Sequence, residues 1–374
     1  MIYIILFVYT VSVAYLIKHS NTYKDCIIDK SVSEQTKRHS LLRINKSSVR
    51  LLVALVIAYA PLIILHAGRY GFGTDYTGTY KNIFYSVQYN YDSVLSSFVE
   101  KGYVLLNKIV WNFTDDYVWV IFCASIVTYI LLIHSIYKNS ETVVASTAMI
   151  FLSGYFLDST TMVRQIIAIT TYMVAVKFIY KRKIIPFIIV IVLASFFHRS
   201  VLILLPMYFV YGRRWKKKTM IIVLGVSLVA APTIYNLVLQ IMSLIPKYAA
   251  YIPAMKRESH FEMMFLLVAV VVFVCMIFND DGSEKYSFWL FHVTIALIIT
   301  ALSGMIPFLF RFLDYFLVTS IILYVPKCMS NIKSRNRRWI FNGGLYTFLA
   351  VYQAYVLYIA NWYKAIPYKS IWNR

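Results

Sequence analysis

Long apolar segments recur at short intervals along the whole sequence. Most of the twelve segments approach the ~20 residues that a helix needs to cross a bilayer, and a soluble fold does not need a dozen such runs. The chain is 60% hydrophobic and only 14% charged, whereas a soluble domain covers itself with more charge. The segments span roughly 1–17, 49–67, 117–137, 142–157, 161–180, 184–197, 201–211, 219–240, 262–279, 287–306, 309–326 and 340–361.

These runs predict an all-α polytopic membrane protein with about twelve transmembrane helices in one domain over residues 1–374. The first segment has no basic residues before it and no small-residue cleavage site, so we expect it to be a spanning helix. The segments 184–197 and 201–211 are short and flank Phe197-His198-Arg199-Ser200. They predict a hairpin that need not cross the membrane fully.

The basic residues predict how the chain is oriented. The formal net charge is +21, but the charges form short clusters between apolar segments instead of one patch, which argues against a nucleic-acid partner. Alternate loops hold 24 of the 37 basic residues, beginning with the loop at 18–50. The positive-inside rule places these loops in the cytoplasm and both termini outside. Contact with the lipid bilayer and its anionic headgroups is the modest further implication.

The longest outer loop covers residues 68–116 and is rich in tyrosine and phenylalanine. Apolar residues recur within it at helical spacing, which predicts an amphipathic helix on the outer leaflet at about 84–113. The loop begins with Gly68-Arg69-Tyr70-Gly71-Phe72-Gly73-Thr74-Asp75-Tyr76. Its glycines would let a ligand approach the backbone, Arg69 would bind phosphate and Asp75 would serve as a base. A plain turn with an arginine at the headgroups is the alternative.

Two polar sites interrupt apolar segments. Arg164-Gln165 lies near the outer end of its segment, and an ionisable residue at membrane depth is a candidate functional residue. Snorkelling of the arginine to the interface is the alternative. His198-Arg199 lies where two short segments meet, and histidine can perform base chemistry near neutral pH. A structural histidine is the alternative there.

Two further clusters are more ambiguous. Arg311 and Tyr315 are four residues apart and share a helix face, although a local ion pair between Arg311 and Asp314 would also explain the charges. Glu100 precedes Lys101, and a solvated ion pair between them is favoured over a buried carboxylate.

The predicted topology places four arginines at the outer ends of their segments or just beyond them. Cations at matched depth suit a lipid-linked diphosphate, which arginine binds bidentately and whose developing charge as a leaving group needs stabilisation. The outer tyrosines suggest a sugar, whose apolar faces pack on aromatic rings. The four are Arg69, Arg164, Arg199 and Arg311.

The sequence predicts no metal site and no cofactor. The four cysteines have no CxxC spacing. The outer acidic residues include no adjacent pair except Asp115-Asp116, which suits helix capping. A magnesium site usually brings one or two carboxylates near substrate phosphates. We therefore expect metal-independent chemistry, and inversion at the anomeric carbon because nothing suggests a paired nucleophile and acid.

The ordered motifs resemble the EpsG family of bacterial polysaccharide polymerases, which is related to Wzy-type O-antigen polymerases. The first block and the histidine hairpin are specific in combination, and the last third matches only through Arg311 and Tyr315. The motifs are Arg69-Tyr70-Gly71-x-Gly73-Thr74-Asp75-Tyr76-x-x-x-Tyr80, Glu100-x-Gly102-Tyr103, Arg164-Gln165 and Phe197-His198-x-Ser200.

The resemblance implies a lipid-carrier-dependent glycosyltransferase with a type C membrane fold in the bacterial cytoplasmic membrane. It would transfer a growing glycan from polyprenyl diphosphate to a hydroxyl of a lipid-linked repeat unit on the outer face, beside other polysaccharide export proteins. A glycan ligase, or a flippase or transporter of the same lipid-linked sugars, is the alternative. The implied catalytic residues are His198, Asp75 and Glu100, and the implied substrate-binding residues are Arg69, Tyr76, Tyr80, Arg164, Gln165, Arg199, Arg311 and Tyr315.

Overall fold

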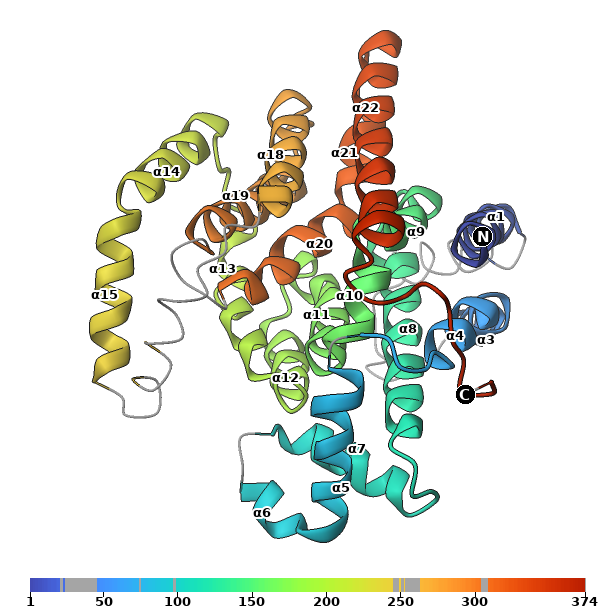
Figure 1. The fold of residues 1–374 in the computed structure, drawn as a ribbon. Coiled ribbons are helices and arrows are strands. Elements are labelled where there is room, and N and C mark those ends of the chain that lie inside the picture. Colours follow the sequence, from blue (N-terminus) through green and yellow to red (C-terminus); the bar gives the residue numbers. More distant parts are fainter. Residues whose placement is uncertain are drawn as a thin grey trace.

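The computed structural model describes residues 1–20, 23, 46–73, 75–96, 99–244, 249, 252, 263–303 and 309–373, and most of these residues are helical. Within these ranges the extended pairing is limited to an isolated antiparallel bridge between Arg69 and Ser370. Most of the inner loop expected at 18–50 lies outside the described residues. Figure 1 shows a central bundle with a smaller helical cap at one end and two separated helices at one side.

Six of the described helical spans are long and apolar enough to cross a membrane. They are α1 (Ile2–His19), α8 (Val118–Asn139), α11 (Val163–Tyr180), α19 (Glu284–Ser303), the run Leu309–Ser330 that joins η3 (Leu309–Phe312), α20 (Leu313–Leu323) and α21 (Val325–Ser330), and the run Arg335–Ala360 that joins α22 (Arg335–Ala354) and η4 (Tyr355–Ala360).

Three bent pairs raise the number of described spans to as many as nine. Pro61 and Pro232 begin the second helices of the first and last pairs, which are bent by 58° and 61°, because proline fits the first turn of a helix but not its interior. Gly154, at a φ of +85°, separates the middle pair, which is bent by 52°. The pairs are α3 (Lys46–Ala58) with α4 (Ala60–Ala67), α9 (Val143–Leu152) with α10 (Tyr155–Thr161), and α14 (Lys217–Val229) with α15 (Ala231–Ser243).

The three remaining predicted segments correspond to shorter apolar helices. Every predicted apolar segment is therefore helical in its described part, but twelve full crossings and the type C fold stay predictions. The shorter helices are α12 (Ile184–Ser195), η2 (Arg199–Leu204) with α13 (Met207–Val210), and α18 (Met263–Phe278), of which Phe265–Phe278 is the apolar part.

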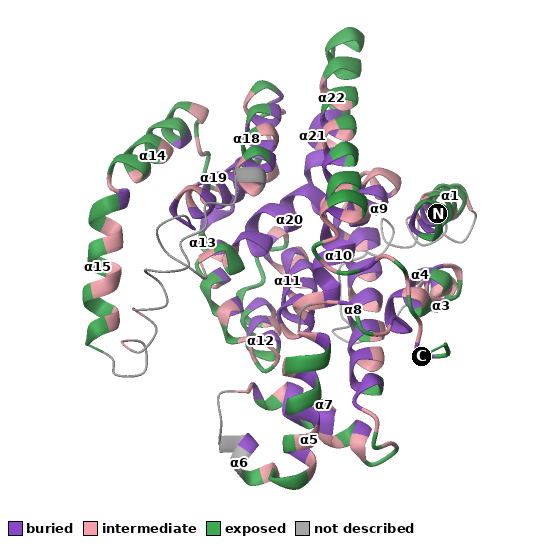
Figure 2. Cartoon of the chain, viewed as in Figure 1, coloured by how far each residue is buried: buried purple, intermediate pink, exposed green. Residues whose placement is uncertain are grey.

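The centre of the bundle is formed by α8, α11, α19 and α20, which are the most buried helices in Figure 2. Helix α11 packs against α8 on one side and α12 on the other. Its buried positions include the small residues Ala168, Thr170 and Ala175, which let helices approach closely in a bilayer. By contrast, α14 and α15 expose most of their apolar side chains (Figure 2), as lipid-facing helices do.

The predicted outer loop forms, in its described residues, a cap with a hydrophobic core of its own. The helix expected at 84–113 is not continuous: the loop folds into η1 (Tyr76–Tyr80), α5 (Lys81–Tyr89), α6 (Tyr91–Ser96) and α7 (Lys101–Trp111). Amphipathic character is present, since α7 buries Tyr103 and Val104 while exposing Leu105 and Ile109. The break arises because α5 packs back on α7, so each helix buries one face against the other.

The last residues form an extended segment that returns to the cap, and we call residues 361–373 the C-terminal strap. Its backbone exchanges hydrogen bonds with the start of the outer loop, from Tyr70 N–H to Lys369 carbonyl (2.9 Å) and from Ile371 N–H to Gly68 carbonyl (2.8 Å). The strap therefore joins α22 to the loop that follows α4, and Figure 1 shows the chain end beside α3 and α4.

Candidate functional site

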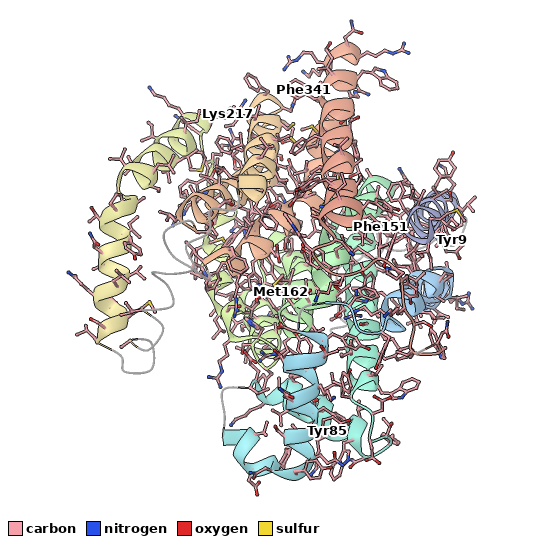
Figure 3. The ribbon with its side chains drawn as sticks, viewed as in Figure 1. Tyr9, Tyr85, Phe151, Met162, Lys217 and Phe341 are labelled. Carbon is pink, nitrogen blue, oxygen red and sulfur yellow. The ribbon has the colours of Figure 1, made fainter. Side chains whose placement is uncertain are left out.

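A cavity of about 640 Å³ lies where the bundle meets the cap. Helices α10, α11 and α20, the hairpin after α12, η1, η3 and the strap all contribute side chains. Met162, one of its lining residues, lies between the cap and α20 in Figure 3. The lining comprises Asp75, Thr79, Tyr80, Asp158, Thr161, Met162, Arg164, Gln165, His198, Phe265, Phe310, Arg311, Leu313, Asp314, Trp362 and Tyr363.

The glycine-rich start of the outer loop forms one rim of this cavity. Gly73 has a φ of +101°, and a Cβ there would lie 2.3 Å from the carbonyl oxygen of Thr160, so only glycine allows this approach. Its N–H donates to the carbonyl of Tyr363 in the strap (3.0 Å). The turn brings Asp75 and Tyr80 to the cavity, and the Tyr80 hydroxyl donates to the Thr161 carbonyl at 2.9 Å.

Arg69 does not line the cavity. It is fully buried, and its amino groups donate to the His66 carbonyl (2.7 Å), Ser125 Oγ (2.9 Å) and Thr160 carbonyl (3.2 Å). Burial lowers the pKa of Arg69 to about 10, which leaves it charged at neutral pH. The guanidinium thus ties α4, α8 and α10 together beneath the glycine-rich turn.

Arg164 does line the cavity, and it forms an ion pair with Glu100. The guanidinium donates to Glu100 Oε2 at 2.5 Å, and only 8% of the glutamate side chain is exposed. The solvated pair with Lys101 that the sequence favoured is therefore wrong. Gly102 explains this placement, since its N–H donates to the Phe196 carbonyl at 2.8 Å, and a Cβ there would lie 2.7 Å from the same oxygen.

The close approach at Gly102 joins the start of α7 to the end of α12. Glu100 Oε1 consequently lies 3.4 Å from the backbone N–H of Arg199. One carboxylate therefore connects the arginine of α11 with the histidine hairpin. Arg199 itself is exposed and lies outside the cavity lining.

His198 begins a chain of polar contacts that leads away from the cavity. Its Nδ1 lies 2.5 Å from Ser200 Oγ, which lies 2.9 Å from the hydroxyl of Tyr315 in α20. When Nδ1 donates to Ser200, Nε2 keeps its lone pair. Burial holds the pKa of His198 below its ordinary value, and the nearby charge of Glu100 opposes this shift only in part. The imidazole is consequently neutral at neutral pH.

The other predicted residues are divided between the cavity and its supports. Gln165 Nε2 donates to the backbone carbonyl of Arg311, which ties α11 to η3, and both residues line the cavity. Tyr315 is fully buried behind Ser200. Tyr76 is also buried, and its hydroxyl donates to the Arg69 carbonyl at 2.9 Å.

Several cavity residues were absent from the sequence prediction of the site. Asp158 and Asp314 are each 7% exposed and line the cavity from α10 and α20. The hydroxyl of Tyr363, in the strap, donates to Asp158 Oδ1. Each aspartate is a single acid within an apolar segment, which is the signal that identified Arg164. The two carboxyl groups show that adjacency in sequence was the wrong criterion for an acidic pair.

The cavity lining combines two kinds of side chain. Arg164 and Arg311 can bind and stabilise an anion, whereas Asp75, Asp158, Asp314 and Nε2 of His198 can accept hydrogen bonds. A ligand that combines an anionic group with hydroxyl groups would suit both kinds.

Comparison with known protein families matches residues 52–370 to the EpsG family. The match covers every element that lines the cavity. No curated protein and no solved structure matches the chain significantly.

Proposed function

Since the chain belongs to the EpsG family of Wzy-like polysaccharide polymerases, we propose that it extends a glycan carried on polyprenyl diphosphate. The growing glycan is transferred to a hydroxyl of a second lipid-linked repeat unit at the outer face of the bacterial cytoplasmic membrane. The protein is a multi-pass membrane protein by its apolar helices and its family. This substrate class needs a site at the membrane boundary for a diphosphate and two sugars.

The observation that carries the proposal is the meeting of Arg164, Arg311 and His198 in one cavity. The two arginines come from different helical elements, and guanidinium groups bind phosphate oxygens bidentately. Glu100 holds Arg164 in place through the 2.5 Å ion pair. Arg69, which is buried beneath the glycine-rich turn, supports the rim on which Asp75 and Tyr80 lie.

The proposed reaction is a single displacement. The acceptor oxygen attacks the anomeric carbon of the donor, and the bond from that carbon to the diphosphate oxygen breaks. The electron pair leaves with the diphosphate, whose charge Arg164 and Arg311 stabilise. His198 Nε2 takes the proton of the acceptor hydroxyl, with Asp75 and then Glu100 as the next candidates for this role. One displacement inverts the anomeric configuration.

We propose that the arginines supply the charge that a divalent metal would otherwise bring to the leaving group. Since Asp75, Asp158 and Asp314 line the same cavity, this claim needs a direct test. The full-length protein, purified in detergent with a defined lipid-linked repeat unit, should produce a ladder of multiples of that unit in excess EDTA. Loss of the ladder in EDTA and its recovery with magnesium would reject metal independence.

The same assay separates the alternatives. A ligase would transfer one glycan to an acceptor of another kind and produce no ladder from repeat units alone. A flippase or transporter would form no covalent product, but would move the lipid-linked unit across the membrane of a proteoliposome. Inversion is checked by comparing the anomeric configuration of the donor with that of the product linkages by NMR.

A further inference from the structure

Asp314 is a buried acid in the lining of the cavity. Among the described residues its side chain has no hydrogen bond or ion pair, although it is 7% exposed and lines the cavity. A buried polar group normally has its hydrogen bonds satisfied. An unsatisfied carboxyl group that faces a cavity therefore points to a ligand.

Asp158 lines the cavity beside Asp314, and the two groups interact electrostatically. Its position is fixed by the strap, because the Tyr363 hydroxyl donates to Asp158 Oδ1. The backbone of Tyr363 is held in turn by Gly73 N–H at 3.0 Å. These contacts hold the Asp158 side chain in place, whereas the Asp314 side chain remains available to a ligand.

Exposed aromatic rings line the cavity as well. Trp362 is 44% exposed and Phe310 is 39% exposed, and both line the cavity. A large ring beside hydrogen-bond acceptors offers an apolar plane together with polar groups at its edge. A pyranose ring presents the complement, with C–H groups on its faces and hydroxyl donors around its rim.

We propose that Asp158, Asp314 and Trp362 form a subsite that binds a sugar ring of the acceptor repeat unit. The subsite rests on the proposed function, and it assigns the acceptor to the part of the cavity that Asp158, Asp314 and Trp362 line. Carboxyl oxygens accept hydrogen bonds, so the two acids suit the hydroxyl groups of a sugar ring. The tryptophan would add nothing to a metal site, which favours a neutral sugar over a cation.

The test uses full-length protein in nanodiscs and two probes. The first is the carrier-free repeat-unit oligosaccharide, cut from the polymer that the producing cells make. The second is inorganic pyrophosphate, which reports on anion binding by Arg164 and Arg311. Binding is measured by saturation-transfer NMR and by competition at millimolar concentration, with and without EDTA.

We expect Asp314→Asn and Trp362→Ala each to weaken oligosaccharide binding by about tenfold, the first through loss of a hydrogen-bond acceptor and the second through loss of an apolar ring face. Pyrophosphate binding should be unchanged in both variants. In the ladder assay the acceptor KM should rise with little change in kcat, as when uniform binding is lost. The matched controls, Asp281→Asn and Trp339→Ala, alter a half-buried aspartate and an exposed tryptophan outside the cavity.

Two results would overturn the subsite. One is oligosaccharide binding that equals wild type in both variants, or that is absent in wild type. The other is binding that requires magnesium, which would make the acids a cation site. If Asp314→Asn fails to fold, Trp362→Ala still decides, because its side chain is partly exposed. Failure of the proposed function is distinguishable, since wild type would then bind oligosaccharide without forming a ladder.

Discussion

The carboxylate of Glu100 accepts a hydrogen bond from the guanidinium of Arg164 at 2.5 Å, across the boundary between the cap and the bundle. Glu100 is the residue that precedes α7, and Arg164 lies in the first turn of α11. The ion pair therefore fixes the position of the cap over the cavity. It also directs one arginine toward the proposed leaving group.

Glu100→Gln should reduce polymerisation by roughly tenfold or more, because a charged hydrogen bond of about 1.5–3 kcal/mol is replaced by a neutral one. Adding Arg164→Lys should cost less than the sum of the two single changes, since the residues are directly coupled. The ladder assay measures both. The control is Glu141→Gln, whose ion pairs with Lys285 and Lys327 lie away from the cavity. Additive effects would show that the pair is not a functional unit.

Arg164→Lys and Arg311→Lys should each lose most activity while the protein still inserts. Lysine keeps the charge but lacks the planar fork that binds phosphate bidentately. A loss of about 1.5–3 kcal/mol corresponds to roughly one to two orders of magnitude in rate. Arg214→Lys, in an exposed loop outside the cavity lining, is the matched control. Full polymerisation by both lysine variants would reduce these arginines to topology anchors.

The acid side of the pH profile should depend on His198. Because burial lowers the pKa of His198, its imidazole gains a proton only below the ordinary histidine pKa of ~6.5. The neutral base therefore persists as the pH falls from 7.5 to about 6, and kcat/KM should decline only at lower pH. His198→Gln should lower activity and remove this limb. A limb centred at or above ~6.5 would contradict the lowered pKa of His198. Full activity in the variant would transfer the role to Asp75 or Glu100.

Gly102→Ala should destabilise the protein, because the new Cβ would lie 2.7 Å from the Phe196 carbonyl oxygen. Overpacking of this kind typically costs about 1–3 kcal/mol, and activity should fall since Glu100 would shift with α7. Thermal unfolding in detergent measures the first effect. Gly343→Ala is the control, because nothing lies within 4 Å of its added Cβ in α22. An equal response of both variants would refute the close approach.

The topology predicts that the cap faces outward. Phe113 is 86% exposed at the cap, and Trp339 is 71% exposed near the start of α22. In intact cells a membrane-impermeant maleimide should label Phe113→Cys and not Trp339→Cys, while permeabilised cells should label both. The unmodified protein controls for its own cysteines. Labelling of Trp339→Cys alone would invert the orientation and place the cavity on the cytoplasmic side.

The sequence is sufficient to locate the apolar helices and the two arginines of the cavity, Arg164 and Arg311. Apolar runs identify helices one segment at a time, and a lone Arg164 or His198 within such a run is a signal of the same local kind. The glycine-rich turn adds Asp75 as a candidate base, and the family resemblance adds Glu100. The sequence does not reveal that the predicted continuous amphipathic helix is interrupted, because the break depends on the packing of α5 against α7.

The parts that sequence reasoning misplaced depend on contacts between distant segments. The guanidinium of Arg69 is of the kind that binds phosphate, but it donates instead to the Thr160 carbonyl and the Ser125 hydroxyl, which belong to other helices. The pair formed by Asp158 and Asp314 is likewise a product of folding, and Tyr363 reaches it only because the strap returns.

The return of the strap has a consequence for biogenesis. The backbone carbonyl of Tyr363 accepts a hydrogen bond from Gly73 N–H, and the Tyr363 hydroxyl donates to Asp158. The ribosome nevertheless makes Tyr363 after every spanning helix in the described part of the chain. A nascent chain with Arg164 and Arg311 already inserted therefore still lacks Trp362 and Tyr363 in the lining of its cavity. The cavity is completed only when the strap folds back onto the loop that follows α4.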